Sequence, residues 1–418
     1  MGAGAAGLGC CRALLPLADV VLADAGAVPG GRGGLQVTWP PGHRDFPAER
    51  EAGFDAGAQY VQSSPSRKTA WDAAVADAFA EGVLDRWDET RVGSVLADTP
   101  LTGFVPVGDA KRLYRARDGG MASLFEFLLE ELHPEDDPAA DFDAASSSGQ
   151  LRYMPRTTCT QVLEGETRRW MVELRVRDGG HYFYRVVDVD YVAVCLPAPR
   201  AARLLGDSPA LSSVLGENSA SGGLLRAAES VAGFACWVLC CAFEGESLGV
   251  FVGDDADVEA ATLPEPWADG VTWVANESAK RRESDGFERW TVQASPQWSA
   301  DRATMKKEEA AEELLAAFLK VTGREDARDR CVRKEAVKWA HSFPAGSAHL
   351  TQPPDNLEDG GAECRGFFLD QQAALGAAGD WIFPARPGVH HAYTSGHDLG
   401  RELAALIQLR ERGAHASG

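Results

Sequence analysis

The chain has 418 residues, of which 45% are apolar, so it can bury a large hydrophobic core, and its length indicates two or more domains. Its formal net charge of −21 argues against non-specific binding to nucleic acid or to an anionic membrane surface, because both need clustered Lys and Arg. No stretch has the apolar length of a transmembrane helix, and the apolar N-terminal segment lacks the basic start of a secretory signal. We therefore expect a globular protein whose partner is a small molecule, with no nucleic acid and no transmembrane segment.

The stretch from Met1 to Gln62 has most of the signals of a dinucleotide-binding segment. Three glycines have the spacing at which a strand turns into a helix, the backbone approaches a pyrophosphate and the phosphates lie at the helix N-terminus. They are Gly2, Gly4 and Gly7. A helix is expected over residues 8–17, and an apolar strand over residues 19–23 ends at Asp24, where an acid binds the adenosine ribose hydroxyls and disfavours a ribose phosphate.

A second glycine pair follows this acid, at Gly30 and Gly31, and precedes Arg32. Glycines allow close backbone approach, and a fixed guanidinium suits the charge of a diphosphate. With 44 glycines in the chain, a chance match of the first three stays an alternative, which Asp24 and this second pair weaken.

Farther along the chain, hydrophobic periodicity and turn residues predict the remaining elements. Helices are expected over residues 66–87, 121–132 and 306–321, and from about Ala392 onward. Strands are expected over residues 158–163, 169–176, 181–194, 231–243 and 331–343, and the short strands between 230 and 295 indicate an antiparallel sheet. Residues 95–117 lack strong periodicity, and residues 133–150 have the polar composition of a solvated insertion.

The nine cysteines show no repeated pair spacing of the kind found in zinc sites or disulfide frameworks. Cys236, Cys240 and Cys241 lie in the apolar run 231–243, which is too short to span a bilayer. We expect these three to pack in a core, no metal site, and a reducing, intracellular setting.

Several blocks of the sequence resemble, in the same order, the renalase-like branch of the FAD-dependent amine oxidoreductase superfamily, a group of NAD(P)/FAD-dependent oxidoreductases. The blocks are Asp24–Arg32, Phe54–Tyr60, Gly119–Phe125, Asp190–Pro199, Trp290–Ser299, Lys338–Trp339, Gly379–Trp381 and Ser395–Gly396, and they span nearly the whole chain. Enzymes of this kind have an apolar strand directly before the first glycine, whereas this chain begins Met1-Gly2. Because that strand is central in a parallel sheet, we expect either a natural start farther upstream or an incomplete sheet.

The elements and the resemblance together predict an α/β fold with a Rossmann-like FAD-binding domain and an inserted, mainly antiparallel α+β substrate domain. The expected FAD-binding domain comprises residues 1–70, 118–205 and 362–418. The expected substrate domain comprises residues 71–117 and 206–361.

The resemblance also implies cofactor contacts outside the first 40 residues. They are Gly57, Ala58, Gln59, Gly379, Asp380, His391 and Ala392. Asp380 would face the ribityl or phosphate groups of the flavin, with a plain turn residue as the alternative. His390 and His391 stand where related sequences tend to have an acid and a glycine, before a helix whose dipole would stabilise negative charge on the flavin. These histidines either contact flavin or substrate, or are surface imidazoles.

Lys280 lies in a basic run with Arg281 and Arg282 and resembles the Ser-Lys-Pro element of the family, but a solvated turn is the favoured interpretation over a pocket role. Four tryptophans are candidates for an aromatic wall opposite the flavin, although packing roles are commoner in strand-rich domains. They are Trp273, Trp290, Trp298 and Trp339. The sequence assigns no catalytic residue.

We therefore expect a FAD-dependent oxidoreductase that oxidises a dihydronicotinamide-like or amine substrate by hydride transfer to the flavin, with oxygen as acceptor. No cysteine after Cys364 could form a covalent flavin thioether, so FAD is expected to be non-covalent. The alternatives are a non-catalytic flavin- or dinucleotide-binding scaffold, and a protein that binds NAD without flavin. We expect a soluble intracellular protein, cytoplasmic by default or plastid-located if a transit peptide precedes Met1; the sequence does not assign an oligomeric state.

Overall fold

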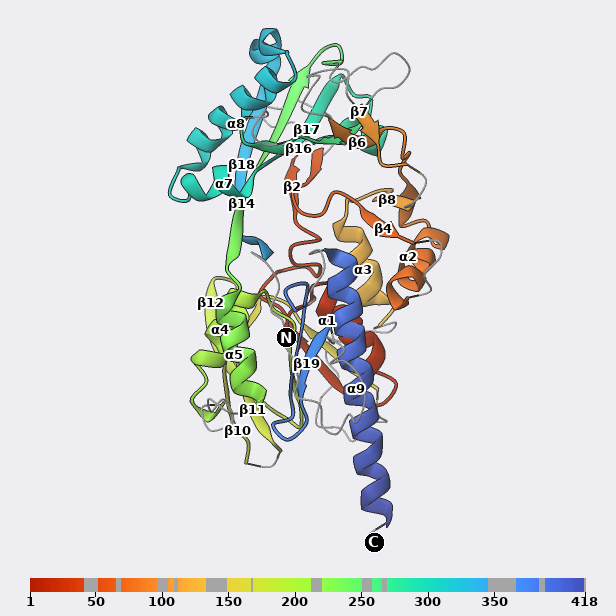
Figure 1. Ribbon diagram of the computed structural model, residues 1–418, viewed down its shortest axis with the longest axis vertical. Helices are drawn as coiled ribbons and strands as arrows, with labels where there is room; N and C mark the ends of the chain where they lie inside the picture. Colours follow the sequence, from red (N-terminus) through yellow and green to blue (C-terminus); the bar gives the residue numbers. More distant parts are fainter. Residues whose placement is uncertain are drawn as a thin grey trace, which may run out of the picture. The chain divides into compact units, whose positions relative to one another are not determined.

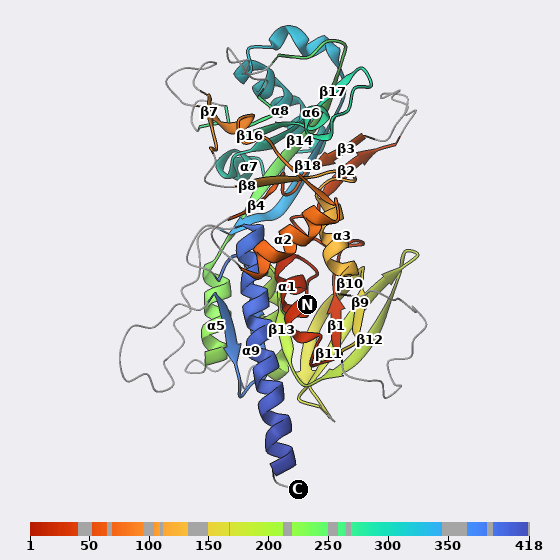
Figure 2. The same ribbon diagram turned by 90° about the vertical axis from the view of Figure 1, so that its right-hand side faces the viewer.

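A computed structural model describes residues 1–40, 52–64, 69–95, 104–108, 112–132, 149–166, 168–211, 220–249, 258–264, 269–344, 366–382 and 388–416. The chain forms two compact units, drawn in Figures 1 and 2. The first unit comprises Met1–Gly33, Phe125–Gly233 and Pro344–Gly418, and the second comprises Gly34–Leu124 and Phe234–Phe343. Each unit is therefore built from segments that are far apart in the sequence. That these units correspond to FAD-binding and substrate domains stays a prediction.

The first unit combines parallel and antiparallel strands with four helices. The helices are α1 (Ala5–Leu14), α4 (Ala198–Gly206), α5 (Ala220–Ser230) and α9 (Val389–Ala416), with the 3-10 turn η1 (Pro209–Leu211). The strands are β1 (Val20–Ala23), β9 (Leu151–Met154), β10 (Thr157–Glu164), β11 (Trp170–Asp178), β12 (His181–Val189), β13 (Val192–Val194), β19 (Phe367–Asp370) and β20 (Leu375–Ala378). Helix α3 (Ala122–Glu130) crosses the boundary between the two units in the sequence.

Strand pairing in the first unit gives two short parallel pairs and one antiparallel meander. β1 pairs in parallel with β9, and β13 pairs in parallel with β20, which β19 joins antiparallel. The meander runs β10-β11-β12 and leaves β12 at its edge. The apolar faces of these strands pack with α4 and α5 into one core, in which the Trp170 indole donates to the Ala373 carbonyl at 2.9 Å.

Met1 and Gly2 lie between β1 and β13. The N-terminal ammonium donates to the Ala193 carbonyl at 2.8 Å, and the Cys195 N–H donates to the Met1 carbonyl at 2.9 Å. On the other side, the Gly2 N–H donates to the Ala23 carbonyl at 2.8 Å. The first two residues therefore join the β1 and β13 strand pairs through hydrogen bonds.

Helices α1 and α9 lie side by side in the first unit (Figures 1 and 2), and glycines allow their close approach. A Cβ atom at Gly396 of α9 would lie 1.8 Å from the Ala6 carbonyl oxygen of α1. A Cβ atom at Gly9 of α1 would lie 2.3 Å from the Tyr393 carbonyl oxygen. Any side chain at either glycine would have to separate the helices, because packed interiors have no spare volume there.

The second unit is mainly antiparallel. Its strands are β2 (Gln36–Trp39), β3 (Ala52–Asp55), β4 (Val61–Ser63), β5 (Leu84–Arg86), β6 (Val92–Val95), β7 (Phe104–Pro106), β8 (Arg112–Ala116), β14 (Gly233–Glu244), β15 (Ala260–Thr262), β16 (Val271–Asn276), β17 (Phe287–Ala294) and β18 (Cys331–Pro344). Its helices are α2 (Ala70–Ala80), α6 (Glu277–Arg281), α7 (Pro296–Asp301) and α8 (Lys307–Val321), with the 3-10 helix η2 (Glu325–Arg330).

A seven-stranded sheet in the order β18-β14-β17-β16-β15-β6-β7 forms the body of the second unit. Helix α8 packs on it, with the Phe318 ring 5.3 Å from the Trp290 ring. The predicted burial of Cys236, Cys240 and Cys241 on β14 is confirmed, since all three are at most 2% exposed. Burial raises the pKa of Cys236 to about 12, so this thiol stays protonated and packs as an apolar group.

The expected helix over residues 66–87 is wrong in its extent. Helix α2 covers only Ala70–Ala80, because Thr69 caps its N-terminus. The Asp72 N–H donates to the Thr69 hydroxyl at 3.1 Å, and the Asp72 carboxylate accepts the Thr69 N–H at 3.0 Å. Gly82, with φ of 76°, then turns the chain into β5. The apolar spacing that suggested one long helix therefore belongs to a helix and a following strand.

Other boundaries also differ from the expectations. The helix expected over residues 8–17 begins three residues earlier, at Ala5, and the strand expected over residues 181–194 is two strands, β12 and β13. The segment 95–117, which lacks periodicity, contains β7 and β8. Most of the expected solvated insertion, residues 133–148, lies outside the described residues.

The predicted mixed α/β class is confirmed, whereas the Rossmann arrangement with an inserted domain stays a prediction. Within the described ranges, no helix is both long and apolar enough to cross a membrane.

Candidate cofactor site

The N-terminus of α1 is the centre of the candidate site. Gly4 is its N-cap residue, has an extended backbone, and brings no side chain to cap the first turn, which is built from the buried residues Ala5, Ala6 and Gly7. The first N–H groups of a helix have no partner inside the helix, so an uncapped end can bind an anion. A Cβ atom at Gly4 would meet no other atom within 4 Å, so open space adjoins this end of the helix.

The other two glycines of the triplet are needed for packing. A Cβ atom at Gly7 would lie 1.7 Å from the Gly2 carbonyl oxygen, and one at Gly2, whose φ is 91°, would lie 2.5 Å from the Cys195 carbonyl oxygen. Gly2 and Gly7 therefore keep the turn into α1 tight, and Gly4 alone of the three adjoins open space.

Asp24 follows β1 and is held against the same turn. Its two carboxylate oxygens accept the N–H groups of Ala3 and Gly26, each at 2.6 Å. Each oxygen keeps a second lone pair, so the carboxylate can still accept hydroxyl donors. Asp24 is thus fixed in position and able to bind a diol.

Tyr153 is a candidate that the sequence did not reveal. It stands opposite Leu22 in the β1–β9 register, and its buried hydroxyl has no hydrogen-bond partner among the described residues. Burial, followed by the negative charge of Asp24, raises the pKa of this hydroxyl. A buried hydroxyl without a partner is uncommon, and a ligand bound at Asp24 would supply one.

Gly30 and Gly31 bring a loop against the α1 turn. The Gly30 N–H donates to the Ala3 carbonyl at 2.8 Å, and a Cβ atom at Gly31 would lie 3.7 Å from the Gly4 Cα. Both glycines have positive φ, 104° and 50°, which other residues rarely adopt. Arg32 follows them and forms an ion pair with Asp380 at 2.7 Å.

Gly379 and Asp380 are held by α9. The Gly379 N–H donates to the Ser395 hydroxyl at 2.9 Å, and the indole of Trp381 donates to the Leu196 carbonyl at 2.9 Å. The Asp380 side chain is 9% exposed, against 28% for that of Arg32. The structure thus brings together residues from both ends of the chain that were predicted separately.

Helix α9 begins with Val389, His390 and His391, all half-buried. The two imidazole rings lie 3.8 Å apart between centroids, and Ala392 is 9% exposed. No acidic residue occupies the first turn, so the positive end of the helix dipole is not neutralised there. Whether these histidines contact a ligand stays a prediction.

Three predicted cofactor residues lie in the second unit, in the turn after β3. They are Gly57, Ala58 and Gln59. The Gln293 side chain donates to the Gly57 carbonyl at 3.2 Å, and the Trp339 indole donates to the Ala56 carbonyl at 3.2 Å. The turn is therefore fixed by two side chains from strands of this unit.

Lys280 is buried beside this turn, at 1% exposure, so the favoured expectation of a solvated turn is wrong. Its ammonium lies 2.5 Å from Asp55 and 3.4 Å from Glu277, and it donates to the Gln59 side-chain oxygen at 3.4 Å. The Gln59 amide in turn donates to the Asp55 carbonyl. A buried cation needs carboxylates close to it. Here they are Asp55 on β3 and Glu277 on α6, the helix that also contains Lys280.

The buried cluster contains two acids and two bases, since Arg281 lies 3.5 Å from Asp55 and 3.4 Å from Glu277. Burial raises the pKa of Asp55, but the charges of Lys280 and Arg281 and the hydrogen bonds from Lys280 and the Met121 N–H outweigh it, so the pKa lies below its usual value. Asp55 is therefore ionised at neutral pH and links β3, α6 and the start of α3.

The four candidate tryptophans have different surroundings. The Trp273 ring lies 5.6 Å from the Tyr60 ring. The Trp339 indole donates to the Ala56 carbonyl, beside the turn at Gly57–Gln59. Trp290 packs in the core against α8. Trp298 stacks with Arg302 at 4.3 Å. Trp273 and Trp339 are thus the two that contact the segment containing Gly57–Gln59.

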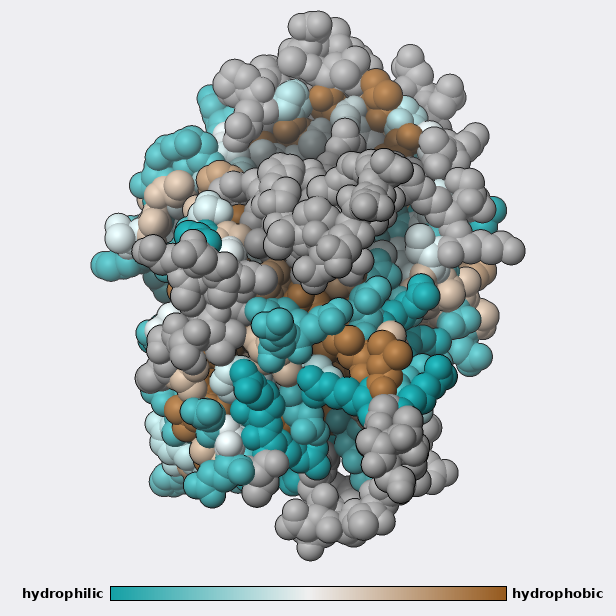
Figure 3. Space-filling model, turned by 60° about the horizontal axis from the view of Figure 1, so that its bottom comes forward, coloured by the Kyte–Doolittle hydropathy of each residue, from teal (hydrophilic) through white to brown (hydrophobic). Residues whose placement is uncertain are grey.

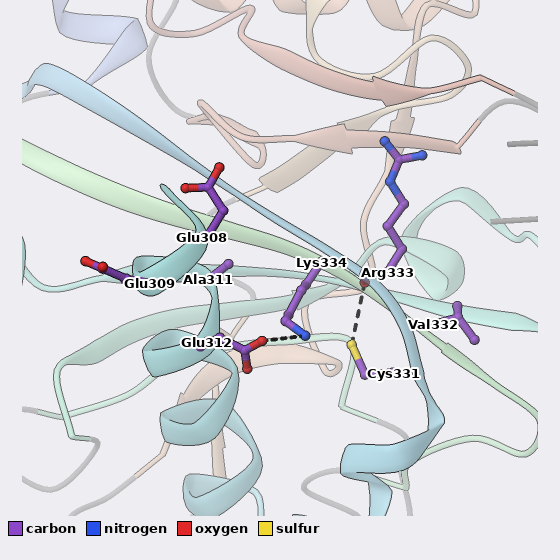
Figure 4. Close-up of a pocket in the computed structure, with 8 residues that line it drawn as sticks. All are labelled: Glu308, Glu309, Ala311, Glu312, Cys331, Val332, Arg333 and Lys334. Carbon is purple, nitrogen blue, oxygen red and sulfur yellow. Dashed lines mark hydrogen bonds and ion pairs between the residues drawn. The ribbon is translucent and has the colours of Figure 1, made fainter. Parts of the chain in front are cut away.

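A hollow of about 500 Å³ lies elsewhere in the second unit, between the start of α8 and the start of β18 (Figure 4). Its lining residues are Glu308, Glu309, Ala311, Glu312, Cys331, Val332, Arg333 and Lys334. Lys334 and Glu312 form an ion pair across it at 2.8 Å. None of the predicted site residues lines this hollow, and among the described residues no group of His, Cys, Asp and Glu is placed to hold a metal ion.

No protein-family model matches the chain. A solved structure of a "putative protoporphyrinogen oxidase" from Exiguobacterium sp. 255-15 is similar, with a TM-score of 0.54 and 13% sequence identity over 97% of this chain and 97% of that chain. An oxidoreductase from Methanosarcina mazei has a TM-score of 0.47 and 12% identity over 95% of this chain and 98% of that chain. At 13% identity the first likeness shows a shared fold, and the TM-score of the second is too low to add to it.

Proposed function

We propose that this chain is a FAD-dependent oxidoreductase that holds FAD non-covalently in its first unit. The observation that carries the proposal is the uncapped N-terminus of α1, with open space at Gly4 and with Asp24 and Gly31 next to it. The fold that the chain shares with the Exiguobacterium structure supports the oxidoreductase class. In this proposal the backbone N–H groups of the first turn of α1 bind the pyrophosphate.

The donor and acceptor groups around that turn fit the rest of an adenine dinucleotide. The Asp24 carboxylate has lone pairs for ribose hydroxyls, and the buried Tyr153 hydroxyl would gain the hydrogen-bond partner that it lacks. Arg32 supplies positive charge for a phosphate, with Asp380 fixing its guanidinium. The absence of a cysteine after Cys364 supports non-covalent binding, because no cysteinyl thioether to the flavin can form there.

When bound, FAD would supply a hydride acceptor whose electrons return to oxygen, so that the chain itself need only bind, orient and exclude water. The chain's contribution lies in fixed dipoles and charges. The N-terminus of α9, with His390 and His391, is the group we propose for stabilising negative charge on the ring system.

We further propose that the substrate is a flat dihydronicotinamide-like ring in preference to a flexible primary amine. The support is the resemblance to the renalase-like branch, including the block Trp290–Ser299, together with the lack of the cysteine typical of covalent monoamine oxidases. A stacked ring can align its hydride-donor carbon at about 3–3.5 Å, which supplies much of the rate without an acid or a base.

Anaerobic mixing of the FAD-loaded protein with dihydronicotinamide isomers, and separately with simple amines, tests this proposal. We expect fast bleaching of the oxidised flavin absorbance by at least one dihydronicotinamide and slow or no bleaching by amines. Bleaching by amines alone would reverse the substrate assignment. A protein that binds FAD and is reduced by neither class would be a flavin-binding scaffold.

A further inference from the structure

Four of the large hydrophobic side chains that remain exposed lie together on β12. The exposed fractions are 59% for Tyr182, 38% for Phe183, 60% for Tyr184 and 57% for Val186. Figure 3, which shows one face of the molecule, illustrates how hydrophobic residues reach the surface in separate patches among hydrophilic ones. Single exposed apolar residues are ordinary, but a contiguous run on one strand indicates a contact surface.

Among the described strands, β12 lies at the edge of its sheet and lacks the usual sequence features that block pairing. It pairs with β11 on one side, and no other described strand pairs with it. The register with β11 runs unbroken from Trp170 opposite Val189 to Asp178 opposite His181, so no bulge twists the edge away. The strand contains neither Pro nor Lys, the residues that commonly block an edge.

The charges around β12 favour a second copy of the same chain as the partner. β11 and β12 together carry three arginines and three acids, which cancel: Arg175, Arg177 and Arg185 against Glu173, Asp178 and Asp188. The whole chain has a net charge of −21, so two copies repel each other over most of their surface. The two strands are a neutral region where two copies can approach without that repulsion.

The sequence of β12 is also complementary to itself in an antiparallel register centred on Tyr184. If Tyr184 stands opposite its own copy, Tyr182 faces Val186 and Phe183 faces Arg185. The last pair repeats a contact already present within the chain, where the Arg185 guanidinium lies 5.5 Å from the Phe183 ring. Moving the centre to Arg185 would set Arg185 opposite itself, and like charges directly opposite are destabilising, whereas moving it to Phe183 would set Arg185 opposite His181.

We propose that two copies of this chain pair along β12, antiparallel and about a two-fold axis at Tyr184, so that two three-stranded meanders become one six-stranded sheet. The four exposed side chains offer on the order of 400 Å² per copy. Because a stable interface buries about 800 Å² per partner, the dimer is weak and depends on protein concentration. This interface is independent of the cofactor proposal, since it uses none of the residues assigned to FAD.

Cysteine cross-linking tests the register. In a Tyr184→Cys variant the two new thiols lie opposite each other, with Cβ atoms about 4.5–5.5 Å apart, so mild oxidation joins them as a disulfide. In the control Tyr182→Cys, which has the same exposure on the same face, the two thiols are four residues out of register, roughly 13 Å apart. We expect at least tenfold more covalent dimer from Tyr184→Cys; equal or reversed yields, or no cross-linking, would overturn the proposal.

Sedimentation velocity over a range of concentrations tests the dimer itself. We expect the wild-type protein to shift from monomer to dimer with concentration, and Tyr184→Asp to raise the dissociation constant at least tenfold. Leu409→Asp, at a 62% exposed position on α9, is the matched control and should leave the dimer unchanged. A monomer at every concentration, or a dimer that survives Tyr184→Asp, would contradict self-pairing along β12.

Discussion

Lys280 shows how a residue's surroundings can differ from what its neighbours in the sequence indicate. It stands first in a run of three basic residues, yet it is 1% exposed because Asp55 and Glu277 lie against its ammonium. Glu277 could have been found from its i,i+3 spacing on a short helix. Asp55 is 225 positions away in the sequence, and only the fold brings it to Lys280.

Replacing Lys280 by Met should cost about 3–5 kcal/mol of unfolding free energy, because it leaves the buried carboxylates of Asp55 and Glu277 to share the cation of Arg281. The double variant Lys280→Met with Asp55→Leu should cost less than the sum of the two single changes, since Glu277 and Arg281 then remain as a balanced pair. Denaturant unfolding of the four proteins measures this coupling.

The exposed pair of Arg203 and Asp207 is the control for that cycle, with side chains 85% and 61% exposed. Arg203→Ala should change stability by less than about 1 kcal/mol. Additive costs at Lys280 and Asp55 would show that their ion pair does not stabilise the second unit.

The same cluster predicts a pH dependence. The pKa of Asp55 is lowered in the folded chain, so its ionised form stabilises the fold above its unfolded pKa of about 3.9, and this contribution is lost as the pH falls through the lower, folded value. The stability difference between wild type and Asp55→Asn should therefore be constant near neutral pH and shrink in acid. A difference that does not change with pH would contradict the ionised state of Asp55.

Gly4 allows a test of cofactor binding that leaves the fold intact. A Cβ atom there meets no other atom within 4 Å and the backbone is extended, so Gly4→Ala should leave the thermal midpoint of the cofactor-free protein unchanged. It should weaken FAD binding at least tenfold, because the methyl group occupies space at the helix end where the pyrophosphate would lie.

Two other glycines provide controls for Gly4→Ala. Gly206→Ala, at the end of α4, also meets no atom within 4 Å, so it should not lower stability and should leave FAD affinity unchanged. Gly7→Ala places its Cβ 1.7 Å from the Gly2 carbonyl oxygen and should lower the thermal midpoint even without FAD. Unchanged FAD affinity in Gly4→Ala would place the cofactor elsewhere.

At the scale of elements, the helices and strands that could be predicted are those whose hydrophobic pattern is complete within the element itself. The helix expected over residues 306–321 is α8 and the apolar run 231–243 is β14, because both patterns repeat within one element. Strands β5, β7 and β8 were missed, since each has three to five residues and depends on pairing with distant segments. A strand of three to five residues is too short to show a period of its own that could be recognised.

The features of the candidate site also divide into those with a local sequence signal and those that depend on distant segments. The glycine turn and Asp24 are close in the sequence and could be predicted from their spacing. The ion pair between Arg32 and Asp380 joins positions 348 residues apart, and the orphaned hydroxyl of Tyr153 depends on the β1–β9 register. Neither the ion pair nor the partnerless hydroxyl has a signal in the sequence, because each depends on which distant segments the fold brings together.

The packing of α1 on α9 gives a prediction at this scale. Gly396→Ala would place a Cβ 1.8 Å from the Ala6 carbonyl oxygen, so the helices must separate, at a cost of about 1–3 kcal/mol. Because α1 provides the turn that we propose binds the pyrophosphate, FAD affinity should fall as well. Thermal unfolding with and without FAD measures both effects, with Gly206→Ala as the control; a variant as stable as wild type would show that the two helices are not in close contact.

At the scale of the molecule, the two units contain different kinds of site. The first unit contains the uncapped helix, Asp24, Arg32 and Asp380, which fit a dinucleotide, and the edge strand β12, which fits a second copy. The second unit contains a buried ionic cluster whose Lys280 donates to Gln59 of the turn at Gly57–Gln59. The central claim, that the chain is a flavoprotein, depends on the first unit alone.

The most direct test of that claim is the absorption spectrum of the purified protein after incubation with FAD and removal of excess, followed by acid precipitation. The account predicts a protein-bound flavin spectrum and free FAD in the supernatant after precipitation. A folded protein that stays colourless with excess FAD would contradict the central claim, and flavin that remains in the pellet would contradict non-covalent binding.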